Sequence, residues 1–183
     1  MIYLMRHGLD DERYVGGYSN IGLISTGIKQ VSDSISTIRK LSINEIVCSD
    51  VLRARQTSEI ISKETNLSVT IDSKLRELDK GLLNGMEKVS AKKLYPEYFE
   101  YLTIYDRYPN GECMLDLYNR IKLLLEEIDK YNNKLLVTHR GVINMIYYLL
   151  NDIELDMNKE RFDVTHASIH ELDVDKKMIR RIY

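Results

Sequence analysis

Short apolar runs alternate along this chain with longer segments in which apolar residues recur every three or four positions. Residues 2–5, 45–48 and 134–138 have the length and composition of strands. Helical patterns lie between and after them, as in residues 27–41 and 51–64. Strands that alternate with helices of this length form right-handed crossover units. The pattern therefore predicts an α/β fold, a three-layer α/β/α sandwich with a mainly parallel central sheet.

The second half of the chain continues this alternation and then changes at its end. An apolar stripe at helical spacing begins at Met114 and runs to Ile128, before Tyr131-Asn132-Asn133 ends it, and this is the longest predicted helix. The tail contains two strand-like segments, 168–174 and 178–182, joined by a polar turn. We expect these two segments to form a closing hairpin.

Between about residues 86 and 110 the pattern changes to a tyrosine-rich stretch. Pro96 is placed as at a helix start, and Pro109-Asn110-Gly111 is typical of a turn. We interpret the stretch as a short helical insertion in a single domain that spans residues 1–183. Its tyrosines recur at helical spacing, where they either line a substrate cleft or pack into the core: Tyr95, Tyr98, Tyr101 and Tyr105.

Composition and charge exclude several classes of protein. A hydrophobic share of 44% with 30% charged residues is typical of a globular chain, not of a disordered one. Lys and Arg total 26 against 28 Asp and Glu, so the net charge of -2 gives no general attraction to nucleic acid. No apolar run reaches the roughly 20 residues that span a bilayer. With Cys48 and Cys113 interpreted as reduced thiols, we expect a cytoplasmic protein without nucleic-acid or membrane partners.

Basic side chains cluster where the predicted strands end. Arg6 and His7 end the first strand, His139 and Arg140 follow the strand at 134–138, and Arg53 begins the helix after the second. Ligands of open parallel sheets bind beyond the carboxyl ends of the strands, so these side chains should converge on one crevice. Cations at helix N-termini oppose the helix dipole, which indicates a bound anion. A phosphate group fits both guanidinium and imidazole chemistry.

The same residues belong to an ordered set of motifs. The motifs are Met5-Arg6-His7-Gly8, Ser49-x-x-Leu52-Arg53-Ala54-x-Gln56-Thr57, Leu75-Arg76-Glu77-x3-Gly81-x3-Gly85, Gly111-Glu112 and Val137-Thr138-His139. In this order and at these spacings, the chain resembles the histidine phosphatase superfamily, also called phosphoglycerate mutase-like. The resemblance covers most of the chain, because its motifs begin at Met5 and end at His139.

The resemblance implies roles for four of these side chains. His7 would be the nucleophile that attacks phosphorus through one ring nitrogen, while its other nitrogen keeps a hydrogen on a backbone carbonyl. Arg6, Arg53 and His139 would bind the phosphoryl oxygens that carry charge in the transition state. This two-step reaction requires no metal ion or other cofactor.

The resemblance also implies a proton donor. Glu77 would protonate the leaving alkoxide and then, as a carboxylate, activate the water that hydrolyses the phosphohistidine. Asp10 and Asp11 are alternative acids, since both follow His7 closely enough in the chain to reach the same pocket.

Three positions are further candidates for substrate contacts. The commoner family pattern has Thr and Asn where this chain has Asp10 and Arg13, and Arg13 is a candidate to replace the asparagine as a phosphate donor. Arg140 stands where the family usually has Gly, either as another substrate contact or on the exposed side of a helix start. Asn20 follows a glycine turn and is a candidate for the pocket rim.

Two histidines, His166 and His170, are four residues apart, and on a helix they could share a metal ion. The surrounding residues indicate instead a loop that leads into a strand. In a strand this spacing separates the side chains by about 13 Å, which is too far for one ion. We expect no metal site.

The predicted activity is that of a metal-independent phosphomonoesterase that hydrolyses a small phosphorylated metabolite. One alternative is phosphoryl transfer of the phosphoglycerate mutase type, and another is a non-catalytic relative that binds phosphorylated ligands. The short insertion favours the phosphatase, because mutases of the superfamily carry longer insertions that supply additional cations. We expect the residues that select the substrate to lie in the insertion.

Overall fold

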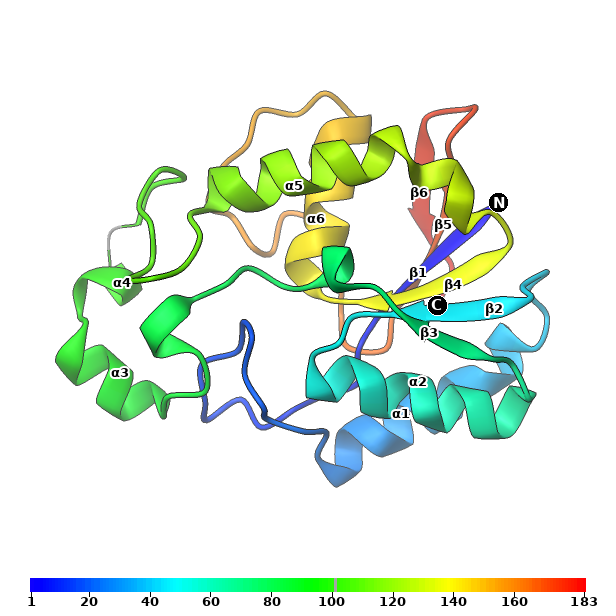
Figure 1. Ribbon diagram of the computed structural model, residues 1–183, viewed down its shortest axis with the longest axis horizontal. Helices are drawn as coiled ribbons and strands as arrows, with labels where there is room; N and C mark the ends of the chain where they lie inside the picture. The colour runs from blue at the N-terminus through cyan, green and yellow to red at the C-terminus, as the bar shows by residue number, and fades with distance from the viewer. Residues whose placement is uncertain (101) are drawn as a thin grey trace.

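A six-stranded sheet forms the centre of the computed structural model, which describes residues 1–100 and 102–183 (Figure 1). The strands are β1 (Ile2–Arg6), β2 (Glu45–Cys48), β3 (Val69–Ile71), β4 (Lys134–Thr138), β5 (Ile169–Asp173) and β6 (Met178–Arg181). Their order in the sheet is β3-β2-β4-β1-β5-β6. The first four are parallel, whereas β5 pairs antiparallel with β1 and β6 pairs antiparallel with β5. The mainly parallel sheet with its closing hairpin is confirmed.

Helices cover both faces of this sheet. They are α1 (Ser25–Ile38), α2 (Leu52–Thr65), α3 (Lys88–Leu94), α4 (Glu97–Glu100), α5 (Met114–Glu126) and α6 (Arg140–Leu150). Alternate residues of β1 face opposite cores: Tyr3 and Met5 pack with α1 and α2, and Ile2 and Leu4 pack with α5 and α6. The three-layer α/β/α sandwich is confirmed (Figure 1). None of the helices in the described part of the chain is long and apolar enough to cross a membrane.

The structure adds one strand to those predicted and shortens one helix. The additional strand, β3, has three residues at the sheet edge, and its Ile71 is exposed. A buried apolar run is therefore absent there, which is why the pattern did not identify it. The apolar stripe from Met114 to Ile128 is present, but α5 ends at Glu126 and Ile128–Tyr131 forms a 3₁₀ turn.

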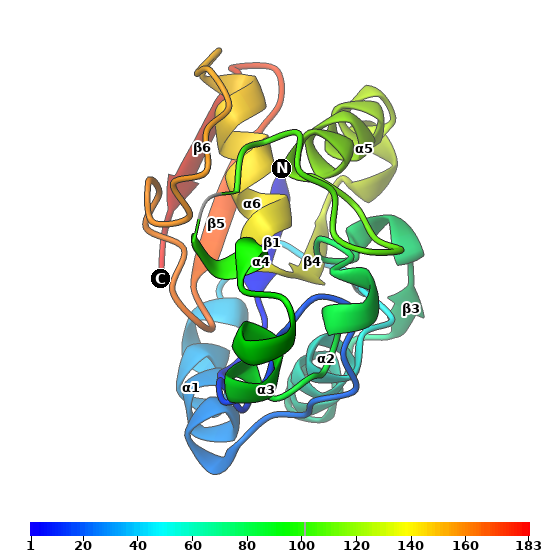
Figure 2. The same cartoon turned by 90° about the vertical axis from the view of Figure 1, so that its left-hand side faces the viewer.

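The insertion is helical, with two short helices, α3 and α4. Pro96 lies between α3 and α4, and residues 102–111 form turns and loop. Tyr101 lies outside the described residues. Figure 2 looks onto the end of the molecule where the insertion lies, with α3 and α4 in front of the sheet.

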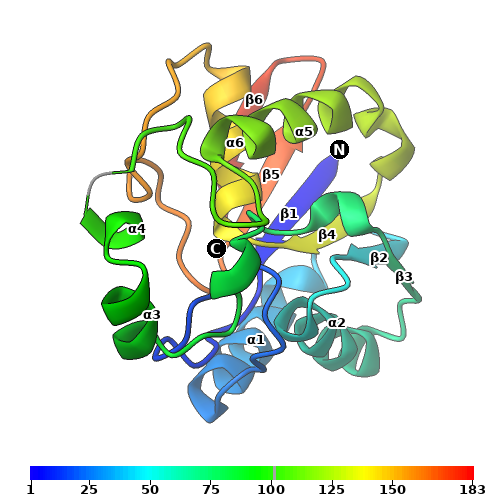
Figure 3. The same ribbon diagram turned by 60° about the vertical axis from the view of Figure 1, so that its left-hand side comes forward.

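A second long connection also reaches this end of the molecule. Residues 151–168 lead from α6 to β5, and Figure 3 shows the loop passing on the same side as α3 and α4. The insertion and the loop 151–168 therefore both lie beside the carboxyl ends of the parallel strands, where ligands of such sheets bind.

Candidate active site

Strand and helix ends bring four predicted site residues together. Arg6 ends β1 and His7 follows it, His139 follows β4, and Arg53 lies in the first turn of α2. All four residues are buried. A pocket of about 170 Å³ adjoins them, and its lining includes Arg6, His7, Arg53 and also Glu77. The crevice predicted from the strand ends is present, lined by Arg6, His7 and Arg53 but not by His139.

His7 is held through one ring nitrogen, which leaves the other available. Its Nδ1 lies 2.7 Å from the carbonyl oxygen of Gly8, so Nδ1 carries the hydrogen and donates it. Its Nε2 accepts a hydrogen bond from Nε of Arg53 at 3.0 Å. Burial, followed by the charge of Arg53, holds the pKa of His7 well below its ordinary value. The ring is therefore neutral, with a lone pair on Nε2, which is the nucleophilic form.

Arg53 is fixed by several further hydrogen bonds. Its Nη1 donates to the hydroxyl of Ser19 at 3.2 Å, and its Nη2 donates to the carbonyl of Gly17 at 2.9 Å. Its Nη2 also lies 3.2 Å from Nδ1 of His139. Only 2% of the residue is exposed. A guanidinium held in one orientation provides a prearranged positive charge for an anion in the pocket.

His139 holds the Arg53 guanidinium in place through a hydrogen bond on the side away from the pocket. Because Arg53 can only donate, Nδ1 of His139 accepts from it, and Nε2 of His139 then donates to the hydroxyl of Ser49 at 2.9 Å. The residue is fully buried and does not belong to the pocket lining. His139 therefore acts on the pocket only through Arg53 and through its ring, which lies 5.1 Å from the His7 ring at an angle of 58°.

Arg6 is the second arginine of the pocket. Its Nη1 donates to the carbonyl of Val164 at 2.8 Å, and its Nη2 lies 2.5 Å from Nε2 of His166. Its Nε is buried without a hydrogen-bond partner among the described residues. Burial, followed by the nearby charge of Arg140, lowers the pKa of Arg6 to about 10. The side chain thus stays cationic at neutral pH and keeps one donor unused.

Glu77 reaches the pocket because a glycine leaves room for it. Its Oε1 accepts from the backbone N–H of Leu78 at 2.9 Å, and its Oε2 accepts from the N–H of Gly141 at 3.1 Å. A Cβ at position 141 would lie 2.1 Å from Oε1 of Glu77. The first turn of α6 therefore positions the carboxyl group, and only glycine allows this approach.

The loop that carries Glu77 is held by Arg120, a residue that sequence reasoning did not identify. Arg120 donates to the carbonyls of Lys74, Arg76 and Glu77 at 3.0–3.1 Å, and also to the carboxylate of Glu112. On sequence grounds Arg120 is an ordinary charged residue on the polar side of a helix. Nothing in its spacing distinguishes it, since its acceptors are backbone carbonyls of a distant loop.

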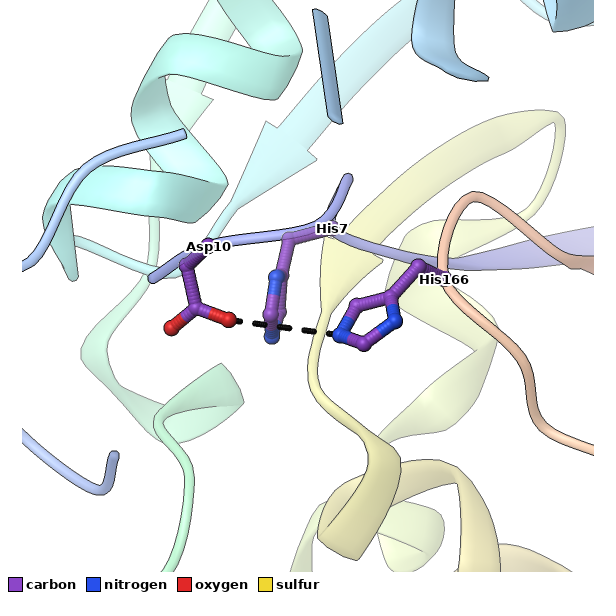
Figure 4. Close-up of side chains that lie close together, drawn as sticks. All are labelled: His7, Asp10 and His166. Atoms are coloured by element: carbon purple, nitrogen blue, oxygen red, sulfur yellow. Dashed lines mark ion pairs between the residues drawn. The ribbon is translucent and has the colours of Figure 1, made fainter. Parts of the chain in front are cut away.

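Asp10 and His166 lie on either side of the His7 ring (Figure 4). Ligand atoms of these three side chains lie within 4.8 Å of one another, and they form the one potential metal-binding group among the described residues. However, Nε2 of His7 and Nε2 of His166 already face the guanidinium groups of Arg53 and Arg6. Two adjacent arginines oppose a cation and favour an anion. The sequence-based expectation of no metal remains a prediction.

The pKa values in this group indicate how it is charged. Burial raises the pKa of Asp10, whose Oδ2 lies 3.6 Å from Nε of Arg53. Burial, followed by the charge of Arg6, lowers the pKa of His166 to about 3, so its ring is neutral. His170 is remote from this group, on β5, where its ring contacts Tyr147 and Ser168. Of the two alternative acids considered, Asp10 lines the pocket and Asp11 does not.

Arg13, Asp11 and Asn20 lie outside the pocket lining. Arg13 pairs with Asp11, and 77% of its side chain is exposed. Asn20 is exposed, whereas its neighbour Ser19 is buried against Arg53. Arg140 does line the pocket, at the start of α6, and pairs with Glu160. Of the three additional substrate contacts considered, the structure brings only Arg140 to the site.

Apart from Lys88 of the insertion, the outer wall of the pocket comes from segments that the sequence did not single out. Within the described residues, none of the tyrosines of the insertion lines it: Tyr95 and Tyr98 contact each other, and Tyr105 is exposed. The wall is formed instead by Tyr14, Lys80, Lys88, Tyr148 and the loop residues Asp156, Met157, Asn158 and Lys159. The loop 151–168 therefore contributes more to the pocket than the insertion does.

Similarity to known proteins identifies the family. A family model described as the histidine phosphatase superfamily (branch 1) matches residues 2–181. The chain belongs to this superfamily. Its membership confirms the resemblance carried by the motifs, and the superfamily includes both phosphatases and mutases.

The similar proteins include curated relatives and solved structures. It is 33% identical over 147 residues to a Citrobacter koseri protein named probable phosphoglycerate mutase GpmB, and 32% identical to the protein of that name from Escherichia coli. Each match covers 75% of this chain and 68% of the relative.

Solved structures with the same fold include a mycobacterial glucosyl-3-phosphoglycerate phosphatase, with a TM-score of 0.73 at 22% identity. That match covers 92% of this chain and 87% of the other. They also include the alpha-ribazole phosphatase of Shigella flexneri, with a TM-score of 0.78 at 21% identity over 98% of this chain and 93% of the other. At these identities the two structures show a shared fold.

Proposed function

We propose that this histidine phosphatase is a metal-independent phosphomonoesterase that hydrolyses a small phosphorylated metabolite through a phosphohistidine on His7. The arrangement of His7 carries the proposal: Nδ1 is tied to the Gly8 carbonyl, and Nε2 faces the fixed guanidinium of Arg53 beside the pocket. A neutral nucleophile next to buried positive charge suits attack on a phosphoryl group.

In the first step, Nε2 of His7 forms a bond to phosphorus while the bond from phosphorus to the ester oxygen breaks. Arg6 and Arg53 stabilise the charge on the phosphoryl oxygens, and the unused Nε donor of Arg6 gains an acceptor. His139 keeps Arg53 in position through its Nδ1. The leaving alkoxide takes a proton from the Glu77 carboxyl group.

In the second step, water hydrolyses the phosphohistidine. The Glu77 carboxylate takes one proton from the water, its oxygen bonds to phosphorus, and the bond from phosphorus to Nε2 breaks. Inorganic phosphate leaves, and His7 and Glu77 return to their starting states. The two N–H groups that hold Glu77 keep its carboxyl group aimed at the pocket in both steps.

The test is turnover of 4-nitrophenyl phosphate in the presence of a metal chelator. We expect full activity with the chelator and a loss of at least about 10³-fold in His7→Ala, since the nucleophile is removed. His170→Ala is the matched control, because His170 is equally buried but lies away from the pocket. Activity that requires added metal, or that survives in His7→Ala, contradicts the proposal.

The second candidate is phosphoryl transfer of the phosphoglycerate mutase type. Two observations favour it: the GpmB relatives carry that name, and the pocket has additional lysines that do not come from a long insertion. Isomerisation of 3-phosphoglycerate in the presence of a bisphosphate primer, at a rate above its hydrolysis, would identify a mutase.

A further inference from the structure

Three lysines line the outer part of the pocket from three different segments. Lys80 follows the Glu77 loop, Lys88 begins α3, and Lys159 lies in the loop 151–168. Lys88 and Lys159 are exposed and Lys80 is half-buried, whereas Arg6 and Arg53 are deeply buried. The lysines therefore form an outer cationic group, distinct from the inner pair of arginines.

These lysines are not neutralised by the protein. Among the residues that the structure describes, none of the three forms an ion pair or donates a side-chain hydrogen bond, although Arg140 beside them pairs with Glu160. Burial, followed by the charge of Lys159, lowers the pKa of Lys80 to about 8. Desolvation of its ammonium group, followed by the charges of Arg140 and Lys88, lowers the pKa of Lys159.

Of the four acidic residues that line the pocket, three have other partners, and the fourth, Glu12, is exposed and acts on Arg6 at the inner end. Glu77 accepts from two backbone N–H groups, and Asp156 accepts from Tyr148 and pairs with Arg161. Asp10 lies against Arg53 on the inner side. Unpaired cations gathered around one pocket are unfavourable unless a ligand brings the opposite charge.

We propose that Lys80 and Lys159, with Lys88 at the rim, bind a second anionic group of the substrate, a carboxylate or a second phosphate. The substrate class is then a phosphate monoester with a second negative charge on the same small molecule. This inference rests on the proposed function, because it takes the arginine end of the pocket as the site of the reacting phosphate.

Two matched phosphate esters test the inference. 3-Phosphoglycerate and glycerol 3-phosphate share a three-carbon skeleton and differ in a carboxylate at the far end. We expect kcat/KM to be at least about tenfold higher for 3-phosphoglycerate, since a charge-assisted contact contributes roughly 1.5 kcal/mol or more. Equal values of kcat/KM for the two esters would overturn the inference.

Two variants test whether the lysines cause the expected preference for 3-phosphoglycerate over glycerol 3-phosphate. In Lys159→Met, and further in Lys80→Met/Lys159→Met, the ratio of the two kcat/KM values should fall toward one. Lys159 is exposed, so its substitution does not endanger folding. Lys93→Met is the control, because Lys93 lies on α3 near Lys88 but outside the pocket lining and should keep the ratio. A ratio unchanged in the double variant contradicts the assignment.

Binding separates this inference from the proposed function. The dissociation constants of both esters can be measured by calorimetry with the His7→Ala protein, which removes turnover. Preferential binding of 3-phosphoglycerate without hydrolysis by the wild-type protein would support the lysine site and refute the phosphatase. Hydrolysis of both esters without any preference in binding would refute the lysine site alone.

Discussion

The two ends of the pocket are both positively charged, but they are built differently. At the inner end, Arg53 and Arg6 are buried and held by neutral acceptors such as the carbonyls of Gly17 and Val164. At the outer end, Lys80 and Lys159 form no ion pair within the described residues, and Nζ of Lys80 lies 6.0 Å from the centre of the Tyr108 ring. Fixed donors suit the stabilisation of a transition state, whereas flexible, partly solvated ammonium groups suit recognition of a charge that does not react.

The largest effect should follow removal of the fixed guanidinium. In Arg53→Lys the charge is retained, but an ammonium group cannot contact His7, Gly17 and Ser19 together. We expect kcat to fall about 10²- to 10³-fold. Steady-state kinetics with 4-nitrophenyl phosphate measure the loss. Arg55→Lys, two residues further along α2 and exposed, should remain near wild type. If Arg53→Lys keeps a tenth of the activity, orientation matters less than charge.

The next effect should come from displacing Glu77 without changing it. The added methyl group of Gly141→Ala would overlap Oε1 of Glu77. Loss of a positioned acid should lower kcat by about 10²-fold for an alkyl phosphate, which has a poor leaving group. The loss should be much smaller for 4-nitrophenyl phosphate. Glu77→Gln should reproduce the same dependence on the leaving group. Equal losses for both substrates in Gly141→Ala would indicate a role other than proton donation.

Because the histidines at the inner end are buried in their neutral form, the free energy of unfolding should depend on pH. The pKa of His166 is about 3 in the folded protein against about 6.5 unfolded. Below pH 6.5 the unfolded chain therefore binds a proton that the folded protein does not, so stability falls as pH falls. Each such histidine should cost about 2 kcal/mol at pH 5 relative to pH 7.5. Urea unfolding at the two pH values measures the free energy of unfolding.

The variant His166→Asn removes one of these titrations. Its free energy of unfolding should decrease less between pH 7.5 and pH 5, by about 2 kcal/mol. Asp11→Asn is a suitable control, since Asp11 lies on the surface beside Arg13. An identical pH dependence in His166→Asn and wild type would show that His166 titrates normally in the folded protein.

The smallest effect should be the response of the outer lysines to salt. Between 50 mM and 500 mM salt, KM for 3-phosphoglycerate should rise a few-fold, about as expected when exposed charges are screened. The kcat should stay nearly constant, because the buried arginines are screened less. Potassium chloride is preferable to phosphate or sulfate, which compete for the pocket. A fall in kcat with unchanged KM would place the salt-sensitive step at the inner end.

The inner end was largely predictable from the sequence, and the outer end was not. Four of its residues lie at strand or helix ends, and the α/β pattern of the sequence places those ends: Arg6, His7, Arg53 and His139. Glu77 was identified only through the family motif, since its position depends on a glycine in α6.

Lys80 and Lys159 reach the pocket through irregular segments, for which hydrophobic periodicity carries no information. Arg120 is similar, because its acceptors are backbone carbonyls that no residue pattern reveals.

The most direct measurement is the site of phosphorylation during turnover. The protein is mixed with 4-nitrophenyl phosphate, quenched in alkali, where phosphohistidine survives, and digested for mass spectrometry. A phosphoryl group on His7 is the predicted result, with a higher yield in Glu77→Gln because hydrolysis of the intermediate is slowed. Turnover with no phosphoryl group on His7 in either protein would contradict the proposed mechanism.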